Sequence, residues 1–166
     1  MCGICGVVNA RPDPGLIERL TADLVRRGPD DEGTWLGDQA SLGFRRLAII
    51  DLSPAGHQPM ASDDGRDVLV FNGEVYNHAE LRAQLERAGV RFRSRSDTEV
   101  LLAGLRHWGL EATLPRLRGM FAFGWYRPEE RRLVLARDHV GIKPLYVATE
   151  PRGPGLAFSS RYDSLF

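Results

Sequence analysis

The apolar residues of this chain fall mostly in short runs that are bounded by glycine, proline and polar residues. Runs of this length, rich in valine and aromatic side chains, are typical of buried β-strands. The first, Ile4–Val8, begins almost at the amino terminus. The pattern predicts further strands at Trp35–Leu36, Ser41–Ile50, Val68–Phe71, Met120–Tyr126, Arg132–Ala136, Leu145–Thr149 and Leu156–Ser159.

Other segments repeat their apolar residues at helical spacing. One follows Pro14 and runs to about Arg26, and a second carries Leu81, Leu85 and Ala88 and stops at Gly89. Ser96–Glu99 fits a capping box at the start of a third helix, which ends at Gly109. A short helix is expected at Leu110–Leu117.

Clusters of glycine, proline and aspartate separate these elements. They predict loops at Arg27–Asp31 and Asp51–Pro59, and Asn72-Gly73 directly after a strand predicts a tight turn with positive φ. Many strands with few, clustered helices indicate an α+β fold in which stacked sheets carry the helices outside.

Composition limits the class of protein. The 166 residues correspond to one domain, since domains usually hold roughly 100–200 residues. Lys plus Arg equals Asp plus Glu at 22 each, so no excess positive charge favours nucleic acid or an acidic membrane surface. No apolar run approaches a membrane span and no signal sequence begins the chain, so we expect a soluble, cytoplasmic protein.

Cys2 is the most reactive candidate in the sequence. Removal of Met1 would place a thiol and a free α-amine on one residue. The amine titrates near about 7.7–8.0 and could act as general base for the thiol, as in N-terminal-nucleophile hydrolases. A second-position cysteine in a frayed terminus would have no such role, but the strand that follows at once ties this terminus into a sheet.

Cys2 and Cys5 also form a C-x-x-C pair, which raises redox and metal-binding alternatives. Zinc needs four ligands, and the four histidines are scattered without ligand spacing, so no metal is expected. A thioredoxin-type pair belongs at a strand-to-helix turn, whereas a strand follows here. We therefore expect Cys5 to be a small core residue.

Several ordered motifs make the whole chain resemble the glutaminase domain of class II glutamine amidotransferases. Phosphoribosyl and sugar-phosphate amidotransferases share the terminal cysteine and the Asn-Gly pair, but Arg46–Leu52 and Asn72–Asn77 are similar to the asparagine-synthetase branch. The motifs are Met1–Gly6, Arg27–Asp30, Arg46–Asp51, Gln58–Pro59, Phe71–Asn77, Ser96–Glu99, Gly119–Phe123 and Arg137–Tyr146.

The resemblance implies a single-domain, four-layer αββα sandwich of the N-terminal-nucleophile hydrolase type. It implies cleavage of the glutamine side-chain amide through a thioester on Cys2, with the Asn72 amide and the Gly73 N–H holding the oxyanion. No cofactor is required. Asn72-Gly73 would also serve as a plain hairpin turn without catalysis.

The same resemblance places L-glutamine among five further residues. Arg46 would form a forked ion pair with the α-carboxylate, Asp97 would hold the α-ammonium beside Glu74, and backbone carbonyls around Leu47 and Ile49 would orient the substrate. Asp97 equally suits the first turn of a helix. Strand alternation puts Arg46 and its neighbour Arg45 on opposite faces, so one of them points into the sandwich.

Residues 2–160 thus form the expected glutaminase domain, and 161–166 a tail where the ATP-dependent synthetase domain of the family would begin. Arg161 stands where the branch has an acidic residue. We expect ammonia to pass to a separate ATP-dependent synthetase or acceptor subunit. The alternatives are a non-catalytic domain that only binds or regulates such a synthetase, and a redox module with a reversible Cys2–Cys5 disulfide.

Overall fold

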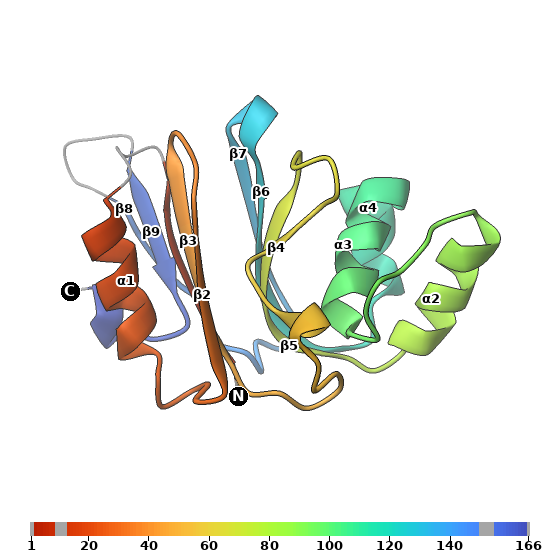
Figure 1. Cartoon of the computed structure of the whole chain (residues 1–166), viewed down its shortest axis with the longest axis horizontal. Coiled ribbons are helices and arrows are strands. Elements are labelled where there is room, and N and C mark those ends of the chain that lie inside the picture. The colour runs from red at the N-terminus through yellow and green to blue at the C-terminus, as the bar shows by residue number, and fades with distance from the viewer. Residues whose placement is uncertain (1, 9–12, 150–154, 166) are drawn as a thin grey trace.

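Two antiparallel sheets face each other in the computed structural model, which describes residues 2–8, 13–149 and 155–165 (Figure 1). Sheet A has the strand order β2-β3-β1-β9-β8, and sheet B has the order β4-β5-β6-β7. The strands of sheet A are β1 (Gly3–Val8), β2 (Asp31–Leu36), β3 (Ala40–Arg46), β8 (Tyr146–Thr149) and β9 (Leu156–Ser159). Those of sheet B are β4 (Met60–Ala61), β5 (Val68–Val75), β6 (Gly119–Arg127) and β7 (Arg132–Arg137).

Helices cover the outer faces of both sheets, which completes four layers (Figure 1). Helix α1 (Pro14–Asp23) packs on sheet A, and α3 (Asp97–Trp108) packs on sheet B with α2 (His78–Arg87) and α4 (Leu110–Thr113) beside it. This confirms the predicted αββα sandwich. Within the part of the chain that the structure describes, no helix is long and apolar enough to cross a bilayer.

Strand alternation distributes the side chains of β1 between two cores. Ile4 and Val8 lie in the core between the sheets, and Cys5 packs under α1 against Ile17 and Leu24. Cys5 has no exposed surface, as expected for a core residue. Burying a side chain such as leucine or isoleucine contributes about 1.5–3 kcal/mol, so these two cores anchor the strand that carries Cys2.

Three predicted boundaries are wrong by several residues. β2 begins at Asp31, inside the predicted loop, because Asp31 pairs with Arg46 of β3. β3 ends at Arg46 rather than at Ile50, because the backbone of Leu47 turns toward the Cys2 thiol. α1 ends at Asp23 rather than near Arg26, where i→i+3 bonds tighten the last turn.

The predicted turn at Asn72-Gly73 is also wrong, because both residues lie inside β5. Gly73 pairs with Phe121 of β6 and does not have a positive φ. A Cβ at Gly73 would lie 2.3 Å from the Met120 carbonyl oxygen. Glycine is needed here because two backbones approach closely, not because the chain reverses.

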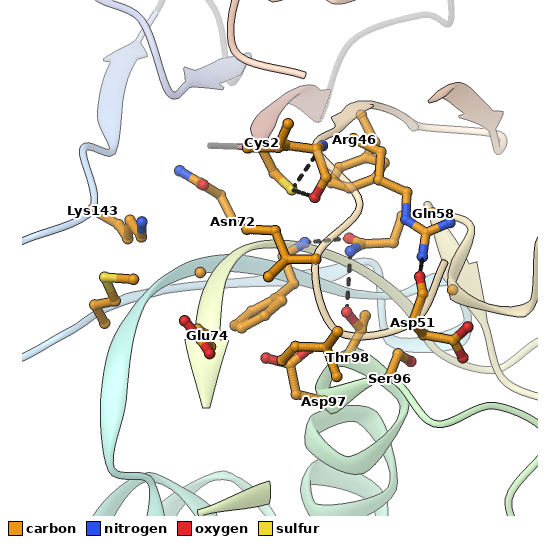
Figure 2. A pocket seen from close by; sticks show the side chains of 18 residues that line it. Cys2, Arg46, Asp51, Gln58, Asn72, Glu74, Ser96, Asp97, Thr98 and Lys143 are labelled. Carbon is orange, nitrogen blue, oxygen red and sulfur yellow. Dashed lines mark hydrogen bonds between the residues drawn. The ribbon is translucent and has the colours of Figure 1, made fainter. Parts of the chain in front are cut away.

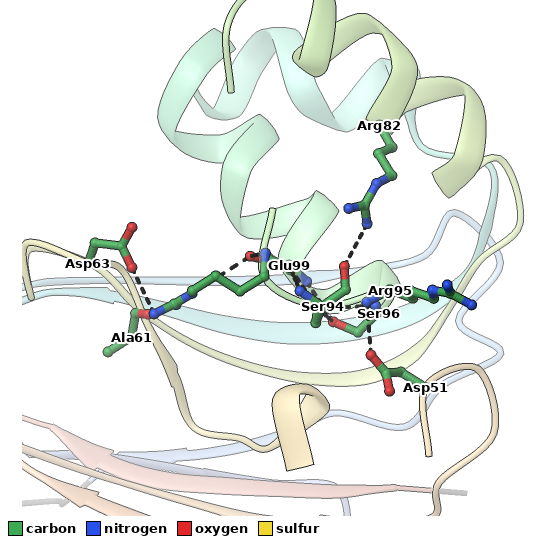
Figure 3. A network of polar contacts seen from close by, with 9 residues as sticks. Asp51, Ala61, Asp63, Arg82, Ser94, Arg95, Ser96 and Glu99 are labelled. Carbon is green, nitrogen blue, oxygen red and sulfur yellow. Dashed lines mark hydrogen bonds and ion pairs between the residues drawn. The ribbon is translucent and has the colours of Figure 1, made fainter. Parts of the chain in front are cut away.

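The start of α3 follows its sequence signal in part. The Ser96 side chain accepts a hydrogen bond from the Glu99 N–H at 3.2 Å, as in a capping box. The Glu99 carboxylate does not return to Ser96; it accepts from the N–H groups of Arg93 at 2.8 Å and Ser94 at 2.7 Å (Figure 3). The segment before α3 is therefore fastened to its first turn.

Candidate active site

A cavity of about 100 Å³ lies where the ends of both sheets meet the first turn of α3. Figure 2 shows Cys2 and Arg46 at one end and Asp97 at the other, with Lys143 and Glu74 to one side and Gln58 to the other. All eight site residues predicted from the sequence line this cavity, namely Cys2, Arg46, Leu47, Ile49, Asn72, Gly73, Glu74 and Asp97. Their chemical roles stay predictions.

The Cys2 thiol contacts the backbone of Leu47. The Leu47 N–H donates to Cys2 Sγ at 3.4 Å, and the thiol lies 3.6 Å from the Leu47 carbonyl oxygen, to which it can donate. Burial raises the pKa of the Cys2 thiol, and the Leu47 hydrogen bond opposes that rise. A nearby base that accepts the thiol proton would therefore increase its nucleophilicity.

Arg27 fixes the backbone of Cys2. Its Nε donates to the Cys2 carbonyl oxygen at 3.1 Å, while its buried Nη2 has no hydrogen-bond partner among the residues that the structure describes. The guanidinium thus restrains the nucleophile without touching the thiol. Arg27 belongs to one of the sequence motifs, but we assigned it no role.

Arg46 points into the cavity and Arg45 does not, as strand alternation predicted. Arg46 Nη1 donates to the Ser53 carbonyl at 2.9 Å, and Nη2 donates to the Asp51 carbonyl. The guanidinium lies against Gly56, where a Cβ would lie 2.3 Å from Nη2. These bonds use part of the five N–H donors of arginine and fix the plane of the fork. Arg45 instead reaches α1 through the Thr21 carbonyl.

Asp97 begins α3, and its carboxylate also reaches β5. Its Oδ2 accepts from the Val75 N–H at 2.9 Å. Burial raises the pKa of the Asp97 carboxyl, and the Val75 bond partly offsets that rise. A buried carboxylate of this kind gains from an adjacent cation, so the position suits an ammonium group of a ligand.

Gln58 connects the cavity wall to β5 and α3. Its Oε1 accepts from the Phe71 N–H at 2.6 Å, and its Nε2 donates to Thr98 Oγ1 at 3.1 Å. The Gln58-Pro59 motif is visible in the sequence, but nothing in its spacing indicates this role for Gln58. Its place shows that it fixes the outer edge of β5 next to the cavity.

The backbone of Gly73 is directed toward that same edge. Gly73 pairs with Phe121 of β6. Both backbone groups of Phe121 point away from β5, because its N–H donates to Asp138 Oδ2 and its carbonyl accepts from the Asp138 N–H. Opposed residues in an antiparallel pair either exchange both bonds or neither, so the Gly73 N–H faces away from β6. Along this edge, the N–H groups two residues before and two residues after Gly73 donate to side chains: that of Phe71 to Gln58 and that of Val75 to Asp97.

Asn72 is fully buried between the sheets. Its Nδ2 donates to Ser160 Oγ at 3.4 Å, and within residues 2–8, 13–149 and 155–165 its Oδ1 has no hydrogen-bond partner. A buried acceptor left unpaired costs about 1–3 kcal/mol. The amide therefore retains unused hydrogen-bonding capacity beside the cavity.

Lys143 is a cavity residue that sequence reasoning did not select. It is buried although it is a lysine, and burial together with the nearby positive charge of Arg27 lowers the pKa of its ammonium. The loop that carries it is fastened by Asp138, whose carboxylate accepts from the Lys143 N–H at 3.0 Å and the Ile142 N–H at 2.8 Å. The motif Arg137–Tyr146 contained the signal, but nothing in the spacing assigned Lys143 to this cavity.

Comparison with known proteins identifies the family of the chain. A family model described as a glutamine amidotransferase domain matches residues 1–166. The chain is 45% identical over 155 residues to asparagine synthetase [glutamine-hydrolyzing] 1 of Bacillus subtilis, covering 90% of this chain and 24% of that protein. It is 40% identical over 157 residues to asparagine synthetase B of Escherichia coli, covering 92% of this chain and 28% of that protein.

A solved structure shows the same fold at low sequence identity. Glutamine phosphoribosylpyrophosphate amidotransferase from Bacillus subtilis, complexed with ADP and GMP, superposes with a TM-score of 0.84. The match has 20% sequence identity and covers 99% of this chain and 43% of that one. The chain thus spans about a quarter of the length of the asparagine synthetases that it matches.

Proposed function

The chain belongs to the glutamine amidotransferase domain family, and from that premise we propose that it hydrolyses the side-chain amide of L-glutamine through a thioester on Cys2. The observation that carries the proposal is the placement of the Cys2 thiol, held by Leu47 at a cavity that Asn72 and Gly73 also line.

In the proposed binding mode the cavity recognises the two ends of the amino acid separately. The Arg46 fork pairs with the α-carboxylate and Asp97 with the α-ammonium. Glu74 supports the ammonium, and the backbone at Leu47 and Ile49 orients the chain of the substrate. The side-chain amide then lies toward Cys2.

Acylation forms one bond and breaks one bond. With Met1 removed, the α-amine of Cys2 accepts the thiol proton while Sγ attacks the side-chain carbonyl carbon. The Gly73 N–H and the Asn72 amide donate to the oxyanion; a single donor of this kind contributes roughly 10²–10³-fold in kcat. The amine returns the proton to the leaving nitrogen, and ammonia departs.

Deacylation repeats the sequence with water as the nucleophile. The Cys2 amine takes a proton from water, the oxygen attacks the thioester carbon, and the thiolate leaves as glutamate forms. The thiol is then regenerated, so each cycle consumes glutamine and water and produces glutamate and ammonia.

Glutamate release by the wild type and by two cysteine variants tests this function. Cys2→Ala should abolish release, whereas Cys5→Ala, which removes the buried thiol under α1, should retain it once thermal melting shows that the variant is folded. Equal rates for the wild type and Cys2→Ala would refute the proposal. Absence of release from both proteins would favour a domain that only binds or regulates a synthetase.

We further propose that the ammonia passes to a separate ATP-dependent synthetase subunit. Support for a synthetase as the acceptor comes from the names of the asparagine synthetases [glutamine-hydrolyzing] that the chain resembles. Affinity purification of the tagged chain from its own cells should recover such a subunit by mass spectrometry. Finding the chain in those cells only as part of a longer polypeptide would contradict the separate arrangement.

A further inference from the structure

Ser160 connects Asn72 to the strand that carries Cys2. It lies just after β9 and is buried, and its Oγ receives two hydrogen bonds. The Ile4 N–H of β1 donates to it at 3.1 Å, and Asn72 Nδ2 of β5 donates at 3.4 Å. The Ser160 N–H also donates to the Ile4 carbonyl at 2.8 Å. One hydroxyl thus bridges sheet A and sheet B next to the cavity.

The amide of Asn72 has two orientations of nearly the same shape. A half turn about its last side-chain bond exchanges Nδ2 and Oδ1. In the orientation of the structure, Oδ1 is buried and no described part of the chain donates to it. In the turned orientation, Oδ1 faces Ser160 and Nδ2 takes the place of the unpaired oxygen.

We propose that Ser160 is a positioning residue that holds Asn72 in the turned orientation, so that Nδ2 is free to donate to the oxyanion. This inference rests on the proposed glutamine hydrolysis. A hydroxyl has one proton and two lone pairs, so Ser160 can accept from Ile4 and donate to Asn72 Oδ1 at once. The turned orientation therefore pairs the buried oxygen with the Ser160 hydroxyl and leaves Nδ2, the donor that the proposed catalysis requires, without a competing bond to Ser160.

The bridge also couples the oxyanion donor to the nucleophile. Ile4 of β1 lies two positions after Cys2, which directly precedes that strand, and the Ile4 N–H fixes the Ser160 oxygen. With that lone pair occupied, the hydroxyl proton is left to Asn72. Removal of the hydroxyl would let the amide sample both orientations, and only one of them stabilises the oxyanion.

Ser159 provides a matched control. It is as deeply buried as Ser160, but its Oγ accepts from the Arg161 N–H at 3.1 Å, whereas Asn72 donates to Ser160. Ser159→Ala removes the same atom from the neighbouring position. A general effect of losing a buried hydroxyl near β9 would appear in both variants.

Steady-state glutaminase kinetics test the inference. Ser160→Ala should lower kcat roughly tenfold to hundredfold, less than complete loss of a donor, with KM within about twofold. Ser160→Thr keeps the hydroxyl and should restore kcat to within about threefold, while Ser159→Ala should leave kcat unchanged. In an Asn72→Ala background, Ser160→Ala should cause no further loss of kcat, because both substitutions remove the same interaction. A Ser160→Ala loss that persists in full in that background would overturn the proposal.

Neutron diffraction from crystals of the wild-type chain in heavy water gives a readout independent of activity. We expect the Ser160 deuteron directed at Asn72 Oδ1 and the Asn72 amide deuterons directed away from Ser160. An Asn72 amide that donates to Ser160 Oγ would overturn the inference even if glutamine is hydrolysed. Failure of the proposed function itself would show separately, as equal glutamate release by the wild type and Cys2→Ala.

Discussion

Leu47 and Cys2, separated by 45 positions in the sequence, contact each other through one backbone and one thiol. The Leu47 N–H lies 3.4 Å from Cys2 Sγ, and the thiol lies 3.6 Å from the Leu47 carbonyl. The register of β1 and β3, which pairs Gly3 with Arg45, brings the two residues together. The end of β3 thus positions both the thiol and the Arg46 guanidinium.

Arg46→Lys should weaken glutamine binding more than turnover. Lysine keeps the positive charge but lacks the forked guanidinium. It also lacks the two hydrogen bonds to the Asp51 and Ser53 carbonyls that fix the plane of the guanidinium. A charge-assisted hydrogen bond contributes about 1.5–3 kcal/mol, so KM should rise roughly tenfold to hundredfold. Arg45→Lys, on the opposite face of β3, should leave KM unchanged; equal shifts in both variants would contradict the assigned role of Arg46.

Asp97→Asn should separate stability from substrate binding. Burial raises the pKa of Asp97 in the folded state, so its protonated form stabilises the fold below about pH 3.9 and that contribution is lost as pH rises through the raised pKa. Asparagine carries no such penalty and can still accept from the Val75 N–H. The Tm of the variant relative to wild type should therefore increase between pH 4 and pH 7, while KM for glutamine rises. A relative Tm that falls over this range would contradict the account.

Gly73→Ala should destabilise the fold, because the new Cβ would meet the Met120 carbonyl oxygen at 2.3 Å and the Phe121 Cα at 2.6 Å. Overpacking of this kind costs roughly 1–3 kcal/mol, measurable by urea denaturation. Gly15→Ala in α1 is the control: its Cβ would meet atoms no closer than 3.4 Å, and alanine favours helix over glycine by up to about 1 kcal/mol. The two substitutions should change stability in opposite directions, and a neutral Gly73→Ala would refute the close approach.

Asp138→Asn should loosen the loop that carries Lys143. Burial alone would raise the pKa of Asp138. Hydrogen bonds from four backbone N–H groups outweigh this effect and lower the pKa below its usual value; the donors are Lys143, Ile142, Phe121 and Val140. The carboxylate therefore stabilises the fold above about pH 3.9, and this contribution is lost as pH falls through the lowered pKa.

An asparagine amide nitrogen cannot accept these bonds, so Asp138→Asn should cost about 1–3 kcal/mol at pH 7 and less in acid. Asp163 is exposed and its carboxylate pairs with Arg161 at the surface, so Asp163→Asn should leave stability nearly unchanged at either pH. Thermal melting of both variants at pH 7 and pH 3 gives the comparison. A loss for Asp138→Asn that is the same at both pH values would contradict the role of its charge.

Local sequence signals were sufficient for most elements of the fold. The strand at Ile4–Val8, the glycine stops after α2 and α3, and the Ser96 cap all depend on neighbouring residues, and all are observed. The Asn72-Gly73 turn was mispredicted because turn preference is local, whereas the pairing of β5 with β6 along its whole length keeps the chain extended.

The residues of the site were predictable from the sequence in two different ways. Alternation alone put Arg45 and Arg46 on opposite faces, and the structure agrees. The gathering of Cys2, Asn72 and Asp97 came from the family resemblance, because no spacing rule brings three separate elements together. Lys143 and Ser160 were missed since each reaches the site from a loop after a strand, where no periodicity indicates direction.

Trapping of a γ-glutamyl thioester tests the central claim most directly. The wild-type chain is mixed with glutamine and quenched in acid, and its intact mass and peptides are measured. We predict an active protein that begins at Cys2 and carries a hydroxylamine-sensitive glutamyl group on that residue, absent from Cys2→Ala and retained in Cys5→Ala. Glutamine turnover by protein that retains Met1, or a glutamyl group on any other residue, would contradict the account.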